Sequence, residues 1–323
     1  MDEVRETPRF EEIEMRIITQ STYGEPSVLD VAEVERPVPS YGQILIELGA
    51  AGVNPVDVAV RAGWFPLLEP PFTLGWDVAG TVVAVGTGIS EFAPRDEVFG
   101  LLAFPDPANA YADYVLASPN EVIAKPTELT MEEAGALPLA GLTAWQAMVG
   151  IADVSAGQRV LVHRAAGGVG HLAVQIAAAH GAHVIGTASA GKHEFVRSLG
   201  AAQLIDHATA DYAEETSDVD VVFDLLGGEH AERSATVLKP GGLIIGAIGS
   251  NLGLTPERAT ELGVRLEVVS VRPSVNDLTE LAALVRAGRL RVHVDGPVPL
   301  ADVAKAHELS AAGHVTGKLV LVP

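Results

Sequence analysis

One segment, residues 159–182, constrains the fold more than any other part of the sequence. It reads RVLVHRAAGGVGHLAVQIAAAHGA, in which an apolar run suited to a β-strand leads through a glycine-rich turn into a stretch with helical periodicity. This order of strand, turn and helix is the dinucleotide-binding fingerprint, here with alanine in place of its first glycine. The segment therefore predicts a βα unit that holds a dinucleotide.

Each position of the turn has a physical role in this prediction. Gly167 would let the backbone approach a pyrophosphate, and Gly170 would let the helix pack closely against the strand. The helix N-terminus would offer unpaired N–H groups and a partial positive charge to the phosphates. A tight turn without a ligand is the alternative, but the strand HVIGTAS follows in the expected place. The predicted phosphate-binding residues are Ala166, Gly167, Gly168, Val169 and Gly170.

The sequence changes character near Leu139. From Met15 to about Pro138, short β-type runs are broken by Gly and Pro, a pattern typical of a barrel-like β unit. From Leu139 onward, apolar runs alternate with helical stretches, which indicates βαβ units on a parallel sheet covered on both faces. After about Arg272 the remaining pieces are too few to fold alone, so they should extend that sheet or return to the first unit. The predicted fold class is α/β.

Charge and composition narrow the choice of partners. The 323 residues carry a formal net charge of −21, so duplex nucleic acid and anionic membranes would be repelled on average. The absence of cysteine excludes disulfides, thiolate metal sites and cysteine nucleophiles. Residues 1–14 have the pattern of neither a signal peptide nor a membrane span, and no apolar run reaches the roughly 18–20 residues of a spanning helix. We therefore expect a cytoplasmic protein that acts on a small molecule.

The second strand of the parallel unit ends in TASAGK, residues 187–192. NAD-specific proteins usually place Asp or Glu there to bind the ribose hydroxyls, and this chain has no acid in the segment. The hydroxyl of Ser189 and the ammonium of Lys192 instead suit a 2′-phosphate, which favours NADPH as the cofactor. The alternative is a helix N-cap followed by a solvated lysine.

Several segments occur in the order and spacing of one enzyme family: GVNPVDVAVRAG, TLGWDVAGTVVAVG, YADYVLA, ALPLAGLTAWQAM, VHRAAGGVG and VLKPGG. On these motifs the chain from Met15 to Pro323 resembles the zinc-independent quinone oxidoreductase branch of the medium-chain dehydrogenase/reductase superfamily. The resemblance implies a GroES-like catalytic domain, a doubly wound Rossmann domain and a cleft between them for the nicotinamide. The predicted parts are an N-terminal extension (1–14), the catalytic domain (15–138), the NADPH-binding domain (139–271) and a return to the catalytic domain (272–323).

The metal ligands of the related zinc alcohol dehydrogenases are missing from this sequence. Those enzymes place a cysteine near the position of Asn54 and a histidine in a Gly-His-Glu motif, where this chain reads Gly75-Trp76-Asp77. All ten histidines lie at His163 or later, so residues 1–162 contain neither His nor Cys. We therefore expect no catalytic zinc built from N and S ligands.

Further site residues are implied by the resemblance, position by position. Asn54 and Asp57 would line the substrate end of the cleft, and Thr143 would lie beside the nicotinamide ribose. From the residues alone, Asn54 belongs to an ordinary turn and Asp57 starts a helix. Loops after two later strands would contact the cofactor through Leu226, Gly227, Ile248 and Gly249.

Other positions have two interpretations. Lys318 stands where the family often has a basic residue near the cofactor phosphate, and His207 stands where a tyrosine is common near the adenosine phosphate. Either residue could also be an ordinary surface side chain. Phe65 stands where the family often has a tyrosine, so the proton donor that the resemblance implies is missing. Trp64, Phe65 and Trp76 offer apolar walls for a flat substrate, although aromatic residues are more often part of a core.

The predicted activity is hydride transfer from NADPH to a quinone or to the activated C=C bond of an enone, with Asn54 or a backbone N–H stabilising charge on the carbonyl oxygen. An enoyl-thioester reductase of lipid or polyketide metabolism and a non-catalytic NADPH-binding protein are the alternatives. The strand LEVVSV offers an apolar sheet edge, so we expect a homodimer.

Overall fold

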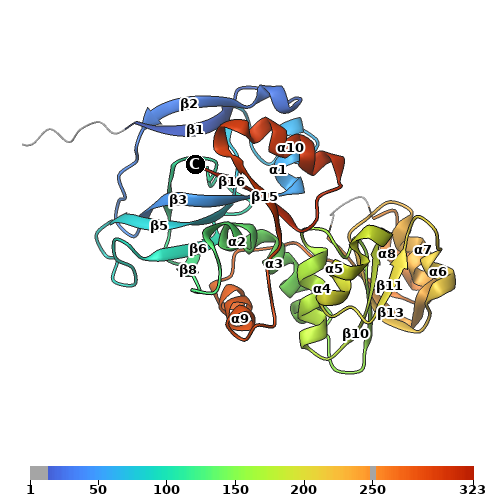
Figure 1. Cartoon of the computed structure of the whole chain (residues 1–323). Helices are drawn as coiled ribbons and strands as arrows, with labels where there is room; N and C mark the ends of the chain where they lie inside the picture. Colours follow the sequence, from blue (N-terminus) through green and yellow to red (C-terminus); the bar gives the residue numbers. More distant parts are fainter. Residues whose placement is uncertain (1–13, 248–251) are drawn as a thin grey trace, which may run out of the picture.

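The computed structural model describes residues 14–247 and 252–323. Figure 1 shows two lobes, a β-rich one that contains both the first strands and the C-terminal strands, and a second one built on a parallel sheet. The predicted cofactor residues Ile248 and Gly249 lie outside the described residues.

The β-rich lobe is built around a seven-stranded sheet with the order β15-β16-β3-β5-β6-β8, and β7 also pairs with β3. Its long strand β3 is buried at almost every position, including Ile44, Leu45 and Ile46, and Glu47 is its one exposed residue. A smaller sheet has the order β2-β1-β4. The strands are β1 (Glu14–Gln20), β2 (Asp30–Glu35), β3 (Ile44–Val53), β4 (Phe72–Thr73), β5 (Asp77–Val85), β6 (Glu97–Leu101), β7 (Tyr114–Ala117), β8 (Val122–Ala124), β15 (Val294–Pro299) and β16 (Lys318–Val322).

Helices cover this lobe and connect it to the second. In Figure 1, α1 and α10 lie side by side over the β-rich lobe, and α2 and α3 run toward the parallel sheet. The helices are α1 (Pro55–Ala62), α2 (Met131–Ala136), α3 (Pro138–Trp145), which continues as a π-helix (Gln146–Ile151), α9 (Val275–Arg286) and α10 (Val303–Ala312), with short 3-10 turns at Pro26–Val28 and Leu300–Asp302.

The second lobe contains a six-stranded, all-parallel sheet with the order β11-β10-β9-β12-β13-β14. Counted along the chain this order is 3-2-1-4-5-6, the doubly wound dinucleotide-binding arrangement, and its switch point lies between β9 and β12. The strands are β9 (Arg159–Val162), β10 (His183–Ala188), β11 (Gln203–Asp206), β12 (Val219–Asp224), β13 (Leu238–Gly246) and β14 (Arg265–Val268).

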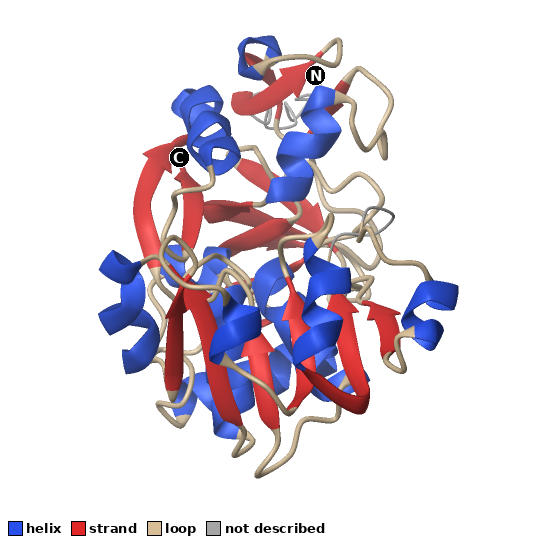
Figure 2. Cartoon of the chain, turned by 90° about the vertical axis from the view of Figure 1, so that its right-hand side faces the viewer, coloured by secondary structure: helices blue, strands red, loops and turns tan. Residues whose placement is uncertain are grey.

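Helices lie on both sides of this sheet (Figure 2), which explains its continuous apolar strands. Along β9, Val160 and Val162 pack into one hydrophobic core, while Leu161 packs into a second core on the opposite face. The covering helices are α4 (Gly170–Ala179), α5 (His193–Ser198), α6 (Tyr212–Glu215), α7 (His230–Ser234) and α8 (Pro256–Glu261), with 3-10 turns at Ala190–Lys192 and Ala235–Val237.

The chain then returns from the second lobe to the first. Strand β16 pairs antiparallel with β3, and β15 pairs parallel with β16, so the C-terminal strands complete the seven-stranded sheet. Strand β14 forms one edge of the parallel sheet and exposes Val268. Within residues 14–247 and 252–323, no helix has the length and apolar character needed to cross a bilayer.

Candidate active site

A buried polar network lies where β3, α1, β5 and β16 meet. Asn54 Nδ2 donates to Asp77 Oδ2 at 2.9 Å, and the Lys318 ammonium donates to Asn54 Oδ1 and, at 3.0 Å, to the carbonyl of Val53. The Lys318 nitrogen is also 3.8 Å from Asp77 Oδ2, which makes a buried ion pair. Asn54, Asp77 and Lys318 are at most 4% exposed. The interpretation of Lys318 as a surface lysine is therefore wrong.

Asp77 also connects this network to α3. Its Oδ1 accepts from the backbone N–H of Leu139 at 2.7 Å, in the first turn of that helix, where the helix dipole favours a carboxylate. Gly52 provides the space for this arrangement, because a Cβ at Gly52 would be 2.3 Å from Asp77 Oδ2. The Asp77 carboxylate thus connects Asn54 to the start of α3.

Burial opposes both charges of the ion pair. It raises the pKa of Asp77 and lowers the pKa of Lys318, and the attraction between the two groups counteracts each shift. Both oxygens of Asp77 accept hydrogen bonds, which further favours the charged form. Removal of either partner would leave an uncompensated buried charge.

Asp57 lies next to this network and closes the first turn of α1. Its Oδ2 accepts from the backbone N–H of Asn54 at 2.6 Å, so the interpretation of Asp57 as a helix-starting residue is confirmed. Burial raises the pKa of Asp57 to about 7, and the Asp77 charge adds to this effect. Among the described residues Oδ1 has no hydrogen-bond partner, although the Tyr111 hydroxyl faces the same carboxyl group. Asp57 is 0% exposed, so the change of charge that this pKa places near neutral pH would occur inside the fold.

The amide of Asn54 has little capacity left for a substrate. Its oxygen is bonded to Lys318, and one Nδ2 hydrogen is bonded to Asp77, so the second Nδ2 hydrogen is the remaining donor. The side chain is 1% exposed. The role of Asn54 as an oxyanion donor stays a prediction, and it is restricted to that one hydrogen.

The glycine-rich loop between β9 and α4 has the packing that its sequence predicts. A Cβ at Gly170 would be 2.2 Å from the carbonyl oxygen of Arg164, so a larger residue would separate the helix from the strand end. The nearest atom to a Cβ at Gly167 would be 3.2 Å away and belongs to the turn itself, so the outer side of the loop is open. The N-terminus of α4 and this open loop fit the pyrophosphate of a dinucleotide.

A direct contact joins this loop to the buried network. The backbone N–H of Gly317 donates to the carbonyl of Ala166 at 2.8 Å, and a Cβ at Gly168 would be 3.0 Å from Cδ of Lys318. The methylene chain of Lys318 thus passes the loop, while its ammonium ends on Asn54. One lysine spans the distance between the predicted cofactor loop and the predicted substrate end.

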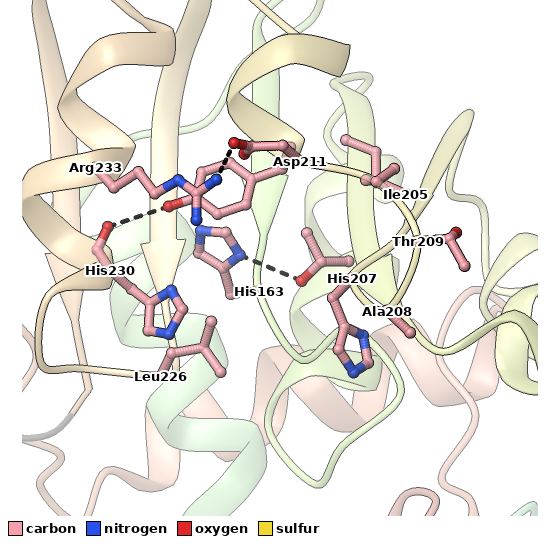
Figure 3. Close-up of a pocket in the computed structure, with 12 residues that line it drawn as sticks. His163, Ile205, His207, Ala208, Thr209, Asp211, Leu226, His230 and Arg233 are labelled. Atoms are coloured by element: carbon pink, nitrogen blue, oxygen red, sulfur yellow. Dashed lines mark hydrogen bonds and ion pairs between the residues drawn. The ribbon is translucent and has the colours of Figure 1, made fainter.

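A cavity of about 310 Å³ lies at the carboxyl ends of β9, β10, β11 and β12, shown in Figure 3. Ligands of open α/β sheets bind at this end of the strands. The predicted cofactor residues His207 and Leu226 are part of its lining. The full lining is His163, Thr187, Ile205, His207, Ala208, Thr209, Ala210, Asp211, Tyr212, Leu226, His230 and Arg233.

The inner wall of this cavity is neutral. His163 is fully buried between Thr187 Oγ1 at 3.2 Å and Ser234 Oγ at 3.1 Å, and burial lowers its pKa to about 4. Arg233 at the rim is paired with Asp211. His207 is exposed at the rim, so its contact with a phosphate stays a prediction.

Asp224 organises the loop that follows β12. Its Oδ1 accepts from the backbone N–H groups of Leu226 at 2.8 Å and Gly227 at 3.0 Å. Asp224 is fully buried, and its Oδ2 has no partner among the described residues. The loop predicted to contact the ribose and nicotinamide therefore has its backbone donors directed inward.

Ser189 and Lys192 lie in the turn after β10. Ser189 occupies the N-cap position of the 3-10 turn Ala190–Lys192, as the alternative interpretation has it, although its side chain makes no capping bond. The Lys192 ammonium donates to the carbonyls of His314 at 2.8 Å and Val315 at 3.1 Å. An ammonium has three donors, so one remains for an anion. Thr143, on α3, donates to the carbonyl of Leu139 at 2.7 Å, next to the Asp77 contact.

The three predicted wall residues differ in exposure. Trp64 is 76% exposed and Phe65 is 52% exposed, both just after α1. Trp76 is 0% exposed, its Nε1 donates to the carbonyl of Asp106 at 2.8 Å, and its ring packs edge-on against Phe104. The structure thus contradicts the prediction that Trp76 lines a substrate site, because no surface of its ring can be reached.

Several functional candidates were not predicted from the sequence. They are Asp77, Tyr111, His163, Asp224 and Arg164. Asp77 stands in the segment Gly75-Trp76-Asp77, and an acid beside a position that lacks the family's histidine ligand is the signal that the sequence offers. The others become visible only through burial or backbone geometry.

Two protein-family models match segments of this chain. The family described as alcohol dehydrogenase GroES-like domain matches residues 40–127, and the family described as zinc-binding dehydrogenase matches residues 199–321. The quinone oxidoreductase of Homo sapiens is 32% identical over 327 residues, with coverage of 95% of this chain and 98% of the relative. The chloroplastic NADPH-dependent alkenal/one oxidoreductase of Arabidopsis thaliana is 34% identical, with coverage of 96% and 80%.

Solved structures of quinone oxidoreductases and of an enoyl reductase have the same fold as this chain. The quinone oxidoreductase from Coxiella burnetii superimposes with a TM-score of 0.91 at 36% identity, covering 96% of this chain and 100% of that one. The Escherichia coli quinone oxidoreductase complexed with NADPH has a TM-score of 0.87 at 29% identity, with coverage of 96% and 100%. The CurK enoyl reductase has a TM-score of 0.87 at 30% identity, with coverage of 95% and 99%. With its GroES-like lobe and its Rossmann lobe, the chain therefore belongs to the quinone oxidoreductase branch of the medium-chain dehydrogenase/reductase superfamily and is an oxidoreductase with a nicotinamide-dinucleotide-binding fold.

Proposed function

We propose that this protein uses NADPH to reduce a quinone or the activated C=C bond of an enone, without a metal ion. The observation that carries the proposal is the contact between the glycine loop and the buried network through Gly317 and Lys318. This contact brings the loop suited to a pyrophosphate next to a polar cluster at the start of α1. NADPH bound there would supply the hydride.

The roles of the protein residues follow from their positions. Gly167, Gly168 and the start of α4 would bind the pyrophosphate, and Lys192 would bind the 2′-phosphate with its remaining donor. Lys318 and Asp77 would position Asn54. Asp57, with its pKa of about 7, would exchange a proton with water near the substrate end.

The proposed independence from zinc rests on two positions. Trp76 stands where the related zinc alcohol dehydrogenases have a histidine ligand, and it is buried in the core. Asn54 stands near the position of the cysteine ligand, and its amide is occupied by Asp77 and Lys318. Neither position offers an imidazole or a thiolate to a metal.

Enoyl-thioester reduction is the second candidate, supported by the likeness to the CurK enoyl reductase. The assay that separates the candidates follows NADPH consumption at 340 nm with a quinone, an enone and an enoyl thioester in parallel. We expect turnover with the quinone or the enone to exceed turnover with the thioester. The reverse order would favour the second candidate, and tight NADPH binding without turnover of any substrate would indicate a non-catalytic binding protein.

We further propose a cytoplasmic homodimer. The exposed edge strand β14, with Val268 41% exposed, supports pairing of two parallel sheets edge to edge. Light scattering coupled to size-exclusion chromatography measures the mass, and a single monomeric species at micromolar concentration would contradict the dimer.

A further inference from the structure

Arg164 adopts a backbone conformation that suits glycine. It is the second residue after β9 and has φ of 49°, in the left-handed region, which non-glycine residues adopt at a cost. The glycine loop and β10 both hold this conformation, because the Arg164 carbonyl accepts from Gly167 N at 2.8 Å and the Arg164 N–H donates to Thr187 Oγ1 at 3.2 Å. Backbone strain of this kind is concentrated at functional sites.

The side chain of Arg164 is available for a ligand. The residue is exposed, and no carboxylate of residues 14–247 or 252–323 lies within 4.0 Å of its guanidinium. The guanidinium reaches across to the loop after α10, since a Cβ at Gly313 would be 3.1 Å from one of its terminal nitrogens. A strained residue thus directs an unpaired cation toward this loop.

Lys192 reaches the same loop from the neighbouring strand. Its ammonium is bonded to the carbonyls of His314 and Val315, which directly follow Gly313. Arg164 and Lys192 follow β9 and β10, which are adjacent parallel strands, so both residues lie at the ligand-binding end of the sheet. Two cations that approach the same loop repel each other, and an anion bound between them would relieve that repulsion.

We propose that Arg164 and Lys192 together bind the 2′-phosphate of NADPH, and that Arg164 determines the preference for NADPH over NADH. The inference rests on the proposed function. A guanidinium presents paired donors that match a phosphate bidentately, which an ammonium cannot do. The 2′-phosphate is favoured over the pyrophosphate because the ribose of a dinucleotide lies beside the turn after the second strand, where Lys192 stands.

The test is Arg164→Gly, which should raise the stability of the ligand-free protein and lower its affinity for NADPH. Glycine adopts the left-handed conformation freely, so the ligand-free variant should have a higher Tm than the wild type. The Kd for NADPH should rise about 10- to 100-fold, as for loss of a charge-assisted phosphate contact. The Kd for NADH should change less than about threefold. Adenosine 2′,5′-bisphosphate and 5′-AMP, titrated in parallel, isolate the contribution of the 2′-phosphate.

Two further variants complete the design. Arg197→Ala removes an exposed arginine of α5 and serves as the control for net charge, so its cofactor affinities should stay near wild type. Arg164→Lys keeps the charge without the paired donors and should have an intermediate Kd for NADPH. Equal weakening of NADPH and NADH by Arg164→Gly would assign Arg164 to the pyrophosphate and overturn the proposal, and unchanged NADPH binding would also overturn it. If the wild type binds neither cofactor, the proposed function itself fails.

Discussion

The two halves of the candidate site differ in how completely their polar groups are satisfied. At the start of α1, Asn54, Asp77 and Lys318 are buried and bonded to one another. At the ends of β9 and β10, Arg164 and Lys192 are partly or fully exposed and have donors left over. In the first region these three side chains bond mainly to one another, whereas in the second region the two cations have donors free for an anion. We therefore expect loss of the buried ion pair to affect stability and loss of either exposed cation to affect cofactor binding.

Lys318→Met should have the largest effect on stability, because it leaves Asp77 buried without its cation. We expect a loss of about 3–5 kcal/mol in the free energy of unfolding, the usual result when one partner of a buried ion pair is removed. Urea denaturation followed by circular dichroism measures it. The matched control is Lys305→Met on α10, an exposed lysine that should change stability by less than about 0.5 kcal/mol. Similar small losses for both variants would show that the network does not stabilise the fold.

Lys192→Ala tests the exposed half. It removes one phosphate ligand, so NADPH binding should weaken by about 1.5–3 kcal/mol while NADH binding stays nearly unchanged. Isothermal titration calorimetry with both cofactors gives the difference. If binding of the two cofactors is weakened equally, Lys192 does not contact the 2′-phosphate.

Asp57→Asn tests whether the buried region contributes to the pH dependence of stability. Because burial raises the pKa of Asp57 to about 7, the folded state retains a proton that the unfolded chain has lost, so wild-type stability falls as the pH rises from about 4 through 7. Asparagine keeps an acceptor for the Asn54 N–H and does not titrate. We expect the variant to show a flatter decline of Tm between pH 5 and 8. An unchanged slope would assign that pH dependence to other groups.

The same variant probes catalysis. With one enone, Asp57→Asn should retain measurable turnover, because we expect water, rather than Asp57, to protonate the product. Asn54→Ala should lower turnover by roughly 10²–10³-fold, the range for loss of one oxyanion donor. If Asp57→Asn alone abolishes turnover and removes a limb of the pH–rate profile, the proton comes from Asp57.

Local patterns in the sequence predicted the features that depend on neighbouring residues. The glycine loop could be predicted because Gly167 and Gly170 act within one turn, and the parallel sheet because its strands are apolar on both faces. The polar network could not be predicted, because Asn54 and Lys318 are separated by 264 positions. The domain boundaries near Leu139 and Arg272 stay predictions.

The interpretations of Trp76 as a substrate wall and of Lys318 as a surface lysine fail for the same reason, which is a polar partner distant in the sequence. Trp76 was assigned to a substrate wall from its residue type, but a bond from its indole N–H to Asp106 makes it compatible with complete burial. Lysine is rarely buried, so residue type alone favours a surface position for Lys318. Its partner Asp77, which makes burial possible, is distant in the sequence. Arg164 was overlooked because its signal is a positive φ, which residue type does not reveal.

The most direct test of the central claim is turnover with NADPH after metal removal. The protein is dialysed against a strong chelator, its zinc content is determined by elemental analysis, and NADPH consumption is followed with a quinone and an enone. We expect less than stoichiometric zinc, unchanged turnover with at least one of the two substrates and a higher kcat/KM for NADPH than for NADH. Loss of turnover on chelation and its recovery with added zinc, or no NADPH consumption with either substrate, would contradict the account.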